Sequence, residues 1–99
     1  MKIDKKYEGK DLIIAIDDRV DTINAPEFEN EIMNEIGNFD SLTLDCTNLE
    51  YISSSGLRVL VKVEKTLKPK NIPFTIKNIN KAIQEIFSLS GFDKILKIE

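Results

Sequence analysis

Three consecutive serines at positions 53–55, followed by Gly56, carry the most distinctive chemistry in the chain. They lie between an apolar stretch that ends at Ile52 and a helical pattern that begins near Leu57. The first N–H groups of a helix lack intrahelical acceptors and carry partial positive charge, so a phosphate at that position is stabilised. A serine in this turn is therefore a candidate phosphorylation site. Helix N-capping is the commoner use of such serines, and it requires no further function.

Several other chemistries are excluded by the residue types that the chain lacks. It has no histidine, so neither a Ser-His-Asp triad nor a histidine metal site can be built from this chain. The single cysteine, Cys46, can form no internal disulfide and no thiolate zinc site, and its apolar surroundings predict a core residue. No glycine-rich phosphate loop is present. We therefore expect a protein that is not an enzyme, with no catalytic residue, metal or cofactor.

The length and composition are those of a small globular protein. With 99 residues and a 41% hydrophobic share, the chain is expected to form one domain over residues 1–99. No apolar run is long enough to span a membrane and no secretory signal is present, so we expect a cytoplasmic protein without membrane insertion. A net charge of -3 and the lack of a basic stripe argue against nucleic acid as a partner.

Strand and helix patterns alternate along the chain, which predicts an α/β fold. Short apolar or alternating runs indicate strands over residues 2–8, 12–16, 41–46 and 74–76, with a further short strand near the C-terminus. Apolar residues at helical spacing indicate helices over residues 24–37, 56–67 and 80–90. We expect the first two strands to form a hairpin within a mixed sheet of four to five strands, with three to four helices packed mainly on one face.

Local signals set the expected boundaries and faces of these elements. Asn24 is the expected N-cap of the first helix and Gly37 its C-cap. The near-continuous apolar run over residues 12–16 predicts a strand covered on both faces. The second helix is apolar over a wide arc, and Val59 and Val63 at the edge of this arc are expected to face a neighbouring helix rather than a partner protein.

Residues 17–21 form a strongly charged segment, Asp-Asp-Arg-Val-Asp. Such residues dominate solvated turns, which is the simplest interpretation. The segment is also placed to form an acidic rim beside the serine turn, and residue types alone leave both interpretations open. The ligand spacing of a calcium loop is missing.

The segment from Leu44 to Leu57, Leu-Asp-Cys-Thr-Asn-Leu-Glu-Tyr-Ile-Ser-Ser-Ser-Gly-Leu, resembles the signature of STAS domains. Among these it is most similar to the small, free-standing anti-sigma factor antagonists typified by the sporulation protein of Bacillus. Residues 18–22 are similar to a loop of that family, and residues 80–92 resemble its last helix and closing Ser-Gly-hydrophobic motif. The resemblance covers nearly the whole chain.

This resemblance implies a protein-binding switch. In such antagonists the unphosphorylated form binds an anti-sigma factor, which is also a serine/threonine kinase of the histidine-kinase-like ATPase fold, and thereby releases a sigma factor. The kinase phosphorylates a serine at the helix start, which breaks the complex, and a PP2C-type phosphatase restores it. The residue that matches the phosphorylated position is Ser54, with Ser53 and Ser55 as the less favoured alternatives. The implied partner-binding residues are Asp21, Thr22, Ser53, Ser54, Ser55, Gly56, Leu57 and Arg58.

Two residues depart from the common family pattern, and two other functions compete with the switch. Ser53 stands where many members have an aspartate, and Arg58 stands where a glycine is frequent. STAS proteins similar to this one also serve as accessory subunits on the ATPase of lipid-transporting ABC systems, which is the alternative function. A hydrolase that uses Ser54 is disfavoured by the missing histidine and by the lack of a Gly-x-Ser-x-Gly elbow.

Overall fold

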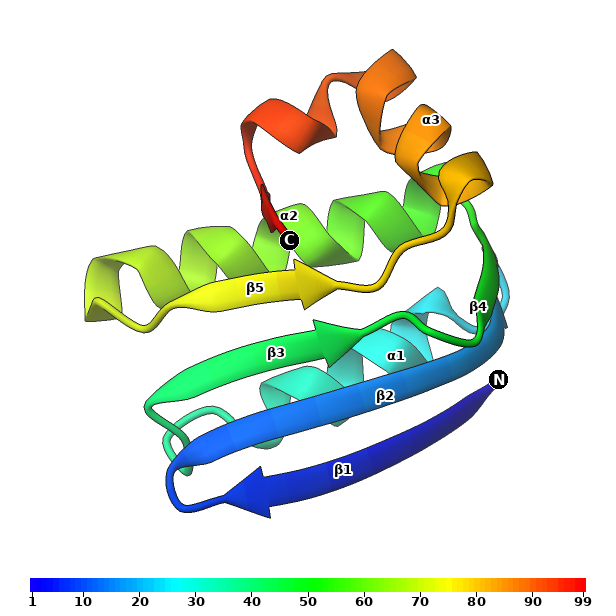
Figure 1. Cartoon of the computed structure of the whole chain (residues 1–99). Helices are drawn as coiled ribbons and strands as arrows, with labels where there is room; N and C mark the ends of the chain where they lie inside the picture. Colours follow the sequence, from blue (N-terminus) through cyan, green and yellow to red (C-terminus); the bar gives the residue numbers. More distant parts are fainter.

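The computed structural model describes residues 1–99 and shows a mixed six-stranded sheet with helices packed against it (Figure 1). The strands are β1 Lys2–Glu8, β2 Asp11–Val20, β3 Ser41–Asp45, β4 Leu49–Ile52, β5 Phe74–Lys77 and β6 Lys97–Ile98. The helices are α1 Ala25–Met33, α2 Ser54–Leu67 and α3 Lys81–Ser90, with two short 3₁₀ helices, η1 Lys68–Lys70 and η2 Phe92–Lys94. The α/β class predicted from the sequence is confirmed. No helix has the combination of length and hydropathy that a membrane crossing requires.

The sheet combines an antiparallel hairpin with parallel strands. β1 and β2 form the expected hairpin, and Gly9 adopts a φ of 63° in its turn. The path through the sheet is β1-β2-β3-β5-β6, with parallel pairing after β2. β4 pairs only with the last residues of β2, also in parallel. The sheet has six strands rather than four to five, because the long β2 pairs with two successive partners and a two-residue β6 lies at the far edge.

β2 continues beyond its expected end at Ile16 and includes most of the charged segment. Val20 is fully buried and pairs with Ile52 of β4, while Asp18 lies at a register irregularity and has a φ of 71°. The solvated-turn interpretation is therefore wrong for residues 17–20. A buried valine and the pairing with β4 keep this charged stretch extended.

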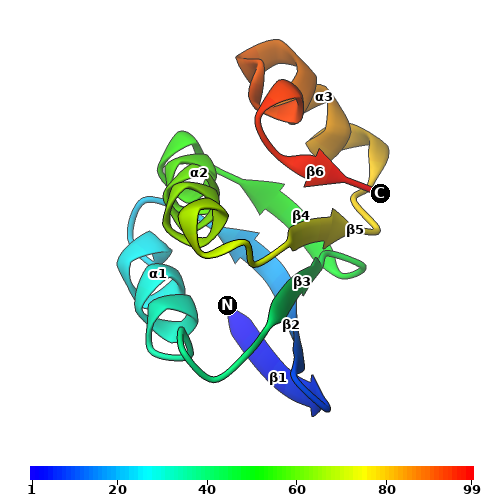
Figure 2. The same ribbon diagram turned by 90° about the vertical axis from the view of Figure 1, so that its left-hand side faces the viewer.

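Helices cover only one face of the sheet along β2. Leu12 and Ile14 of this strand are fully buried, whereas Ile13 and Ala15 on the opposite face are only half-buried. The expectation that both faces of this strand are covered is therefore wrong. Figure 2 shows the reason, since α1 and α2 both lie on the same side of the sheet.

α1 and α2 lie side by side and enclose the core together with the covered face of the sheet (Figure 2). Phe28 and Ile32 of α1 are fully buried, as are Val63 and Leu67 of α2. Val59 is 5% exposed, one turn before Val63. α1 packs against α2, and Val59 lines a surface hollow together with Ala25, Pro26 and Glu29 of α1, which confirms the prediction for this valine.

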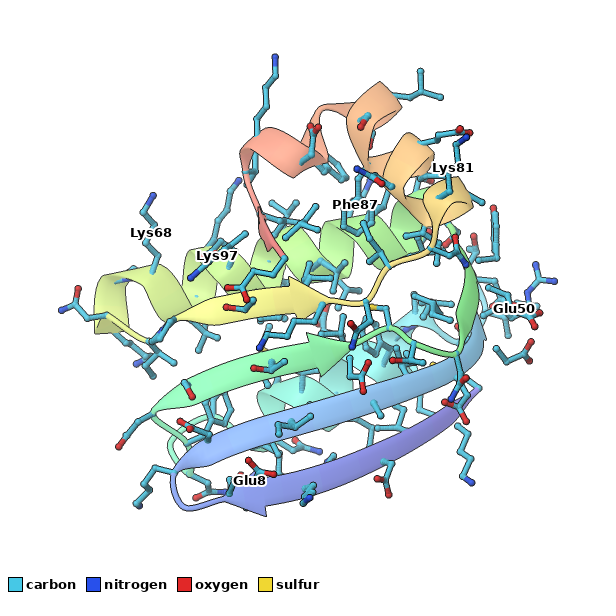
Figure 3. All side chains as sticks on the ribbon, viewed as in Figure 1. Glu8, Glu50, Lys68, Lys81, Phe87 and Lys97 are labelled. Atoms are coloured by element: carbon cyan, nitrogen blue, oxygen red, sulfur yellow. The ribbon has the colours of Figure 1, made fainter.

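α3 lies across the end of the sheet near β4 (Figure 1). Its N-cap is Asn80, whose side-chain oxygen accepts the N–H of Ile83 at 2.9 Å and whose amide donates to the Leu49 carbonyl at 3.1 Å. The cap therefore also ties α3 to β4. Gly91 ends the helix with a φ of 76°, which agrees with the helix predicted over residues 80–90. Figure 3 shows Phe87 directed inward from α3, and this residue is 1% exposed.

α1 departs from its predicted boundaries at both ends. Asn24 precedes the helix, but its side chain makes no capping hydrogen bond. The helix ends at Met33, and residues 34–37 form turns, with Gly37 at a φ of 103°. Ile36 is only half-buried, so little apolar burial is available to hold a further helical turn together.

Candidate functional site

The serine turn and the loop after β2 form one surface because their strands are parallel neighbours. Val20, the last residue of β2, pairs with Ile52, the last residue of β4. The N–H of Ser53 donates to the carbonyl of Val20 at 2.8 Å. Asp21 and Ser53 therefore leave the same edge of the sheet, as the acidic-rim interpretation expected for Asp21.

Ser53 is the N-cap of α2 and is committed to the fold. Its backbone is extended, the residue is 8% exposed, and its Oγ accepts the N–H of Gly56 at 3.2 Å. The structure thus gives Ser53 the capping role that serines commonly have at helix starts. α2 begins at Ser54, two residues before the expected start. The first residues of the helix carry no apolar side chain, so apolar spacing could not include them.

Among the serines of this turn, Ser54 alone presents an unengaged hydroxyl. It is the first residue of α2, it is exposed, and its Oγ makes no hydrogen bond within the chain. Ser55 is half-buried, and its Oγ lies 3.4 Å from Thr22 Oγ1, within hydrogen-bond distance. The first turn of α2 contains no acidic residue, so the partial positive charge of its N–H groups is uncompensated. The site therefore places an accessible hydroxyl beside a helix start that favours an anion.

The residues predicted to bind a partner divide by burial. Exposed or half-buried at the surface are Asp21, Thr22, Ser54, Ser55 and Arg58. Buried beneath it are Ser53, Gly56 and Leu57. A partner can touch the first group, while the second group holds the turn in place.

Gly56 allows the first turn of α2 to pack directly on β2 and β4. A Cβ at this position would lie 2.7 Å from Cγ1 of Ile52 and 2.8 Å from Cγ1 of Val20, closer than two carbon atoms approach without repulsion. Leu57, the next residue, is 3% exposed and belongs to the hydrophobic core. Gly56 and Leu57 therefore determine how closely the serine turn packs on the sheet.

Asp21 organises the loop that precedes α1. Its Oδ1 accepts the N–H groups of Asn24 and Ile23, both at 2.9 Å, and the Oδ1 of Asn24 accepts the N–H of Asp21 at 2.8 Å. Hydrogen bonding by the Asn24 N–H outweighs desolvation and, with help from the Ile23 N–H and the Arg19 charge, lowers the pKa of Asp21. This reciprocal pair explains why Asn24 does not cap α1, since its side-chain oxygen is already bound to Asp21.

The same loop holds an apolar side chain in solvent. Ile23 is 91% exposed, and the hydrogen bond from its N–H to Asp21 fixes its backbone next to Thr22. Single exposed apolar residues are common on protein surfaces, so the position beside the serine turn is what distinguishes this one. Ile23 is not among the partner-binding residues predicted from the sequence. The signal that could have identified it is an isoleucine inside an otherwise polar turn.

One protein-family model matches both the segment from Leu44 to Leu57 and the rest of the fold. The sequence model described as the STAS domain matches residues 2–99. The chain belongs to the STAS domain family. The match includes all six strands and both loops of the surface, so the STAS domain covers the serine turn and the Asp21 loop alike.

Proteins similar to this STAS domain include several anti-sigma factor antagonists by name. BtrV from Bordetella bronchiseptica, which is named as a candidate anti-sigma factor antagonist, is 31% identical over 94 residues, covering 94% of this chain and 80% of the relative. An anti-sigma factor antagonist from Mycobacterium paratuberculosis has a crystal structure with a TM-score of 0.89 at 20% identity, covering 98% of this chain and 83% of that one. SpoIIAA has been solved unphosphorylated, with a TM-score of 0.84 at 13% identity over 99% of this chain and 88% of that one. Its phosphorylated form has a TM-score of 0.77 at 14% identity, over 99% of this chain and 91% of that one. These structural likenesses establish the fold alone.

Two arginines flank the surface of this STAS domain. Arg58 is exposed one turn after Ser54 and forms no ion pair. The guanidinium of Arg19 lies 5.1 Å from the ring centroid of Tyr51, and its Nε is 3.4 Å from Asp21 Oδ2. Arg19 is thus engaged by two neighbours, whereas Arg58 is available to an added anion.

The cysteine of the STAS domain belongs to the hydrophobic core. Cys46 is buried, as predicted, and burial together with the neighbouring Asp45 charge raises its pKa to about 12. No group of three or more histidine, cysteine, aspartate or glutamate residues is arranged to hold a metal ion. The accessible hydroxyl of the serine turn is that of Ser54.

Proposed function

We propose that this STAS domain is an anti-sigma factor antagonist whose protein-binding surface is switched off by phosphorylation of Ser54. The observation that carries the proposal is the free, exposed hydroxyl of Ser54 at the start of α2, next to the loop that displays Ile23. The relatives named as anti-sigma factor antagonists, and the two solved forms of SpoIIAA, support it. The protein acts by binding rather than by catalysis.

In the free protein, the fold accommodates a phosphate on Ser54. The modification adds about two negative charges at pH 7. The N–H groups at the start of α2 stabilise this charge, since no acidic residue lies in the first turn. Arg58, one turn further along and unpaired, adds a cation. Phosphorylation therefore leaves the folded structure intact.

The switch operates in the complex with the partner. A protein that covers Ser54 must take the phosphate out of water, and an acidic or apolar partner surface repels or desolvates a dianion. Losing about 3 kcal/mol of binding free energy weakens affinity more than a hundredfold, which is sufficient to exchange one partner for another.

The proposed partner is an anti-sigma factor that is also a serine/threonine kinase of the histidine-kinase-like ATPase fold. Ser54 Oγ attacks the γ-phosphorus of ATP bound to the kinase, the bond from that phosphorus to the β–γ bridging oxygen breaks, and ADP leaves. A base on the kinase accepts the hydroxyl proton, because Ser54 Oγ has no hydrogen-bonded base within this chain. A PP2C-type phosphatase hydrolyses the phosphoserine with water, which restores the hydroxyl and releases inorganic phosphate.

Phosphosite mapping tests this proposal. The purified chain is incubated with ATP and an anti-sigma serine kinase of the proposed class, and the modified peptides are identified by mass spectrometry. We expect phosphate on Ser54, no incorporation in Ser54→Ala, and retained incorporation in the matched variant Ser55→Ala. Ser53→Ala controls for folding, since it loses the N-cap at a cost of about 1 kcal/mol but keeps the acceptor hydroxyl. Phosphate on Ser53 or Ser55 with Ser54 unmodified refutes the assignment.

A further inference from the structure

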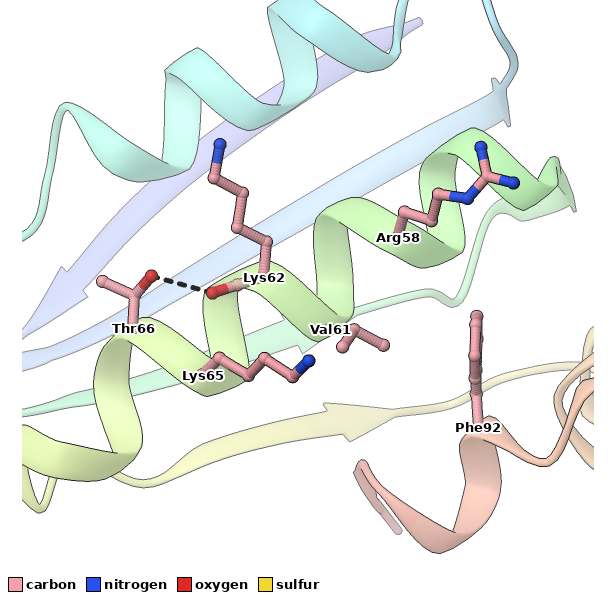
Figure 4. A pocket seen from close by; sticks show the side chains of 6 residues that line it. All are labelled: Arg58, Val61, Lys62, Lys65, Thr66 and Phe92. Atoms are coloured by element: carbon pink, nitrogen blue, oxygen red, sulfur yellow. Dashed lines mark hydrogen bonds between the residues drawn. The ribbon is translucent and has the colours of Figure 1, made fainter.

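A groove lies between α2 and η2 (Figure 4). It has a volume of about 440 Å³ and is lined by Arg58, Val61, Lys62, Lys65, Thr66 and Phe92. Apart from Arg58 at one end, none of these residues belongs to the predicted partner-binding set. The groove is therefore a second surface feature, distinct from the serine turn and the Asp21 loop.

The groove is cationic in a chain that is acidic overall. Three of its six lining residues are basic and none is acidic, although the net charge of the chain is -3. Lys62 Nζ lies 3.0 Å from Glu29 Oε2, and Figure 4 shows this side chain directed toward α1. Arg58 and Lys65 form no ion pair. These two residues therefore supply the uncompensated charge of the groove.

Apolar side chains lie between the two cations. Val61 is half-buried on α2, between Arg58 and Lys65 along the helix, and Phe92 projects from η2 toward it (Figure 4). A side chain that enters the groove exchanges water for contact with these two residues. An aromatic side chain gains further from packing on Phe92 and from the neighbouring cations.

The spacing of the cations fits a short extended peptide. Arg58 and Lys65 are seven residues apart on α2, and a helix rises by 1.5 Å per residue, so their Cα atoms are about 10 Å apart along the axis. An extended chain rises by about 3.3 Å per residue and its alternate side chains share one face, so residues i and i+4 lie about 13 Å apart with residue i+2 between them on that face. The long, flexible side chains of Arg58 and Lys65 can reach groups at this separation. Two carboxylates with an apolar residue between them therefore match the two cations and Val61. A single compact anion meets only one of the cations.

We propose that this groove binds an acidic segment of a partner protein, with carboxylates on Arg58 and Lys65 and an apolar or aromatic side chain between Val61 and Phe92. The sign of the charge requires an acidic ligand, and the length over which the cations are spread favours a peptide over a small anion. The groove shares Arg58 with the serine turn but does not include the Ser54 hydroxyl, so the inference holds whether or not that serine is the switch.

Peptide titration followed by ¹H–¹⁵N NMR tests the inference. The probe is the acetylated and amidated pentapeptide Asp-Glu-Phe-Glu-Asp, and a second peptide has glycine in place of phenylalanine. We expect saturable shifts confined to the groove, weakened by added salt, and binding of the glycine peptide that is weaker by about threefold or more. Arg58→Glu/Lys65→Glu should weaken binding by at least about tenfold. Lys68→Glu/Lys70→Glu, which reverses two cations outside the groove, should bind like the wild type.

Several outcomes overturn the inference. One is an equal loss of binding in both double variants. Another is a set of chemical-shift changes spread over residues near all surface lysines instead of the groove. A third is the absence of saturable chemical-shift changes at millimolar peptide. Saturable binding of phenyl phosphate at the groove without peptide binding also overturns it, because the groove then accepts a small anion. Equal urea midpoints for the variants exclude unfolding as the cause of lost binding. Ser54→Ala should bind the peptide like the wild type, so this test and phosphosite mapping fail independently.

Discussion

Truncation of Ile23 to alanine isolates the contribution of the exposed loop to partner binding. Ile23 is 91% exposed in the free protein, so its side chain contributes almost nothing to the folded core. Leu89 is 89% exposed and lies at the C-terminal end of α3, on a different element. Because the two side chains have the same size and nearly the same exposure, Leu89→Ala is a matched control for a general loss of apolar surface.

The expected loss of affinity follows from the apolar surface that a partner covers. Truncating isoleucine to alanine removes three carbon atoms, and each buried carbon is worth about 0.8 kcal/mol. Full burial of Ile23 in the complex therefore contributes about 2 kcal/mol, which corresponds to a roughly thirtyfold change in the dissociation constant. In the free protein the same truncation should change the free energy of unfolding by less than about 0.5 kcal/mol, as is usual for exposed positions.

Calorimetric titration with the anti-sigma partner measures the affinity, and urea denaturation measures the stability. We expect Ile23→Ala to bind roughly thirtyfold more weakly. Leu89→Ala should bind with unchanged affinity, and both variants should keep the wild-type urea midpoint. If Ile23→Ala binds like the wild type, or if Leu89→Ala loses as much affinity, the loop is not part of the contact surface and the reasoning is refuted.

Three further predictions concern the turn, the loop and the switch. Gly56→Ala should lower the free energy of unfolding by about 1–2 kcal/mol, because overpacking against Ile52 and Val20 costs more than the gain in helix propensity. Urea denaturation measures the change, and stability at or above that of the control Ser54→Ala would contradict it. Asp21→Asn should make the free energy of unfolding fall less steeply on acidification. The pKa of Asp21 is lowered in the folded state, so its ionised carboxylate stabilises the fold above the ordinary pKa of 3.8, and this contribution is lost as the pH falls through the folded-state pKa. Thermal denaturation across about pH 5 to pH 2 checks this, and identical profiles for the two proteins would count against it. Phosphorylated Ser54 should leave NMR shifts unchanged beyond the serine turn and its neighbouring loop, whereas a globally altered spectrum would exclude a surface mechanism.

Sequence reasoning succeeded best where the structural signal is local. The predicted hairpin forms with a turn at Gly9, and α3 lies between its N-cap Asn80 and Gly91, close to the helix predicted over residues 80–90. Helical spacing alone places Val59 and Val63 on one face of α2, so their burial could also be predicted.

The differences in the fold arise from contacts between segments that are distant in the sequence. β2 continues through the charged residues because β4 pairs with Asp18, Arg19 and Val20, and nothing within that stretch signals the pairing. Asn24 has the residue type of an N-cap, but Asp21 binds its side chain in the folded loop. At the end of β2 and at Asn24, tertiary contacts therefore override the conformation that the local residue types favour.

The sequence predicted which residues form the candidate site, but not the hydrogen bonding and exposure of their side chains. The three serines are identical in type, so the sequence cannot tell them apart. In the structure, the Ser53 hydroxyl accepts the N–H of Gly56 and the Ser55 hydroxyl lies beside that of Thr22, which leaves only the Ser54 hydroxyl free. The exposure of Ile23 depends on the turn that Asp21 closes, which the sequence does not reveal. Phosphorylation within the turn stays a prediction.

The two loops of the surface are anchored at the same place. The end of β2 is bound to the segment around β4 by the Asp18 N–H, which donates to the Asn48 carbonyl at 2.9 Å, and by the Ser53 N–H, which donates to the Val20 carbonyl at 2.8 Å. A docking protein therefore meets a backbone that is already ordered, and association costs little conformational entropy on this side of the complex. Any conformational change on complex formation therefore occurs in the partner, whose loops must adapt to this rigid surface.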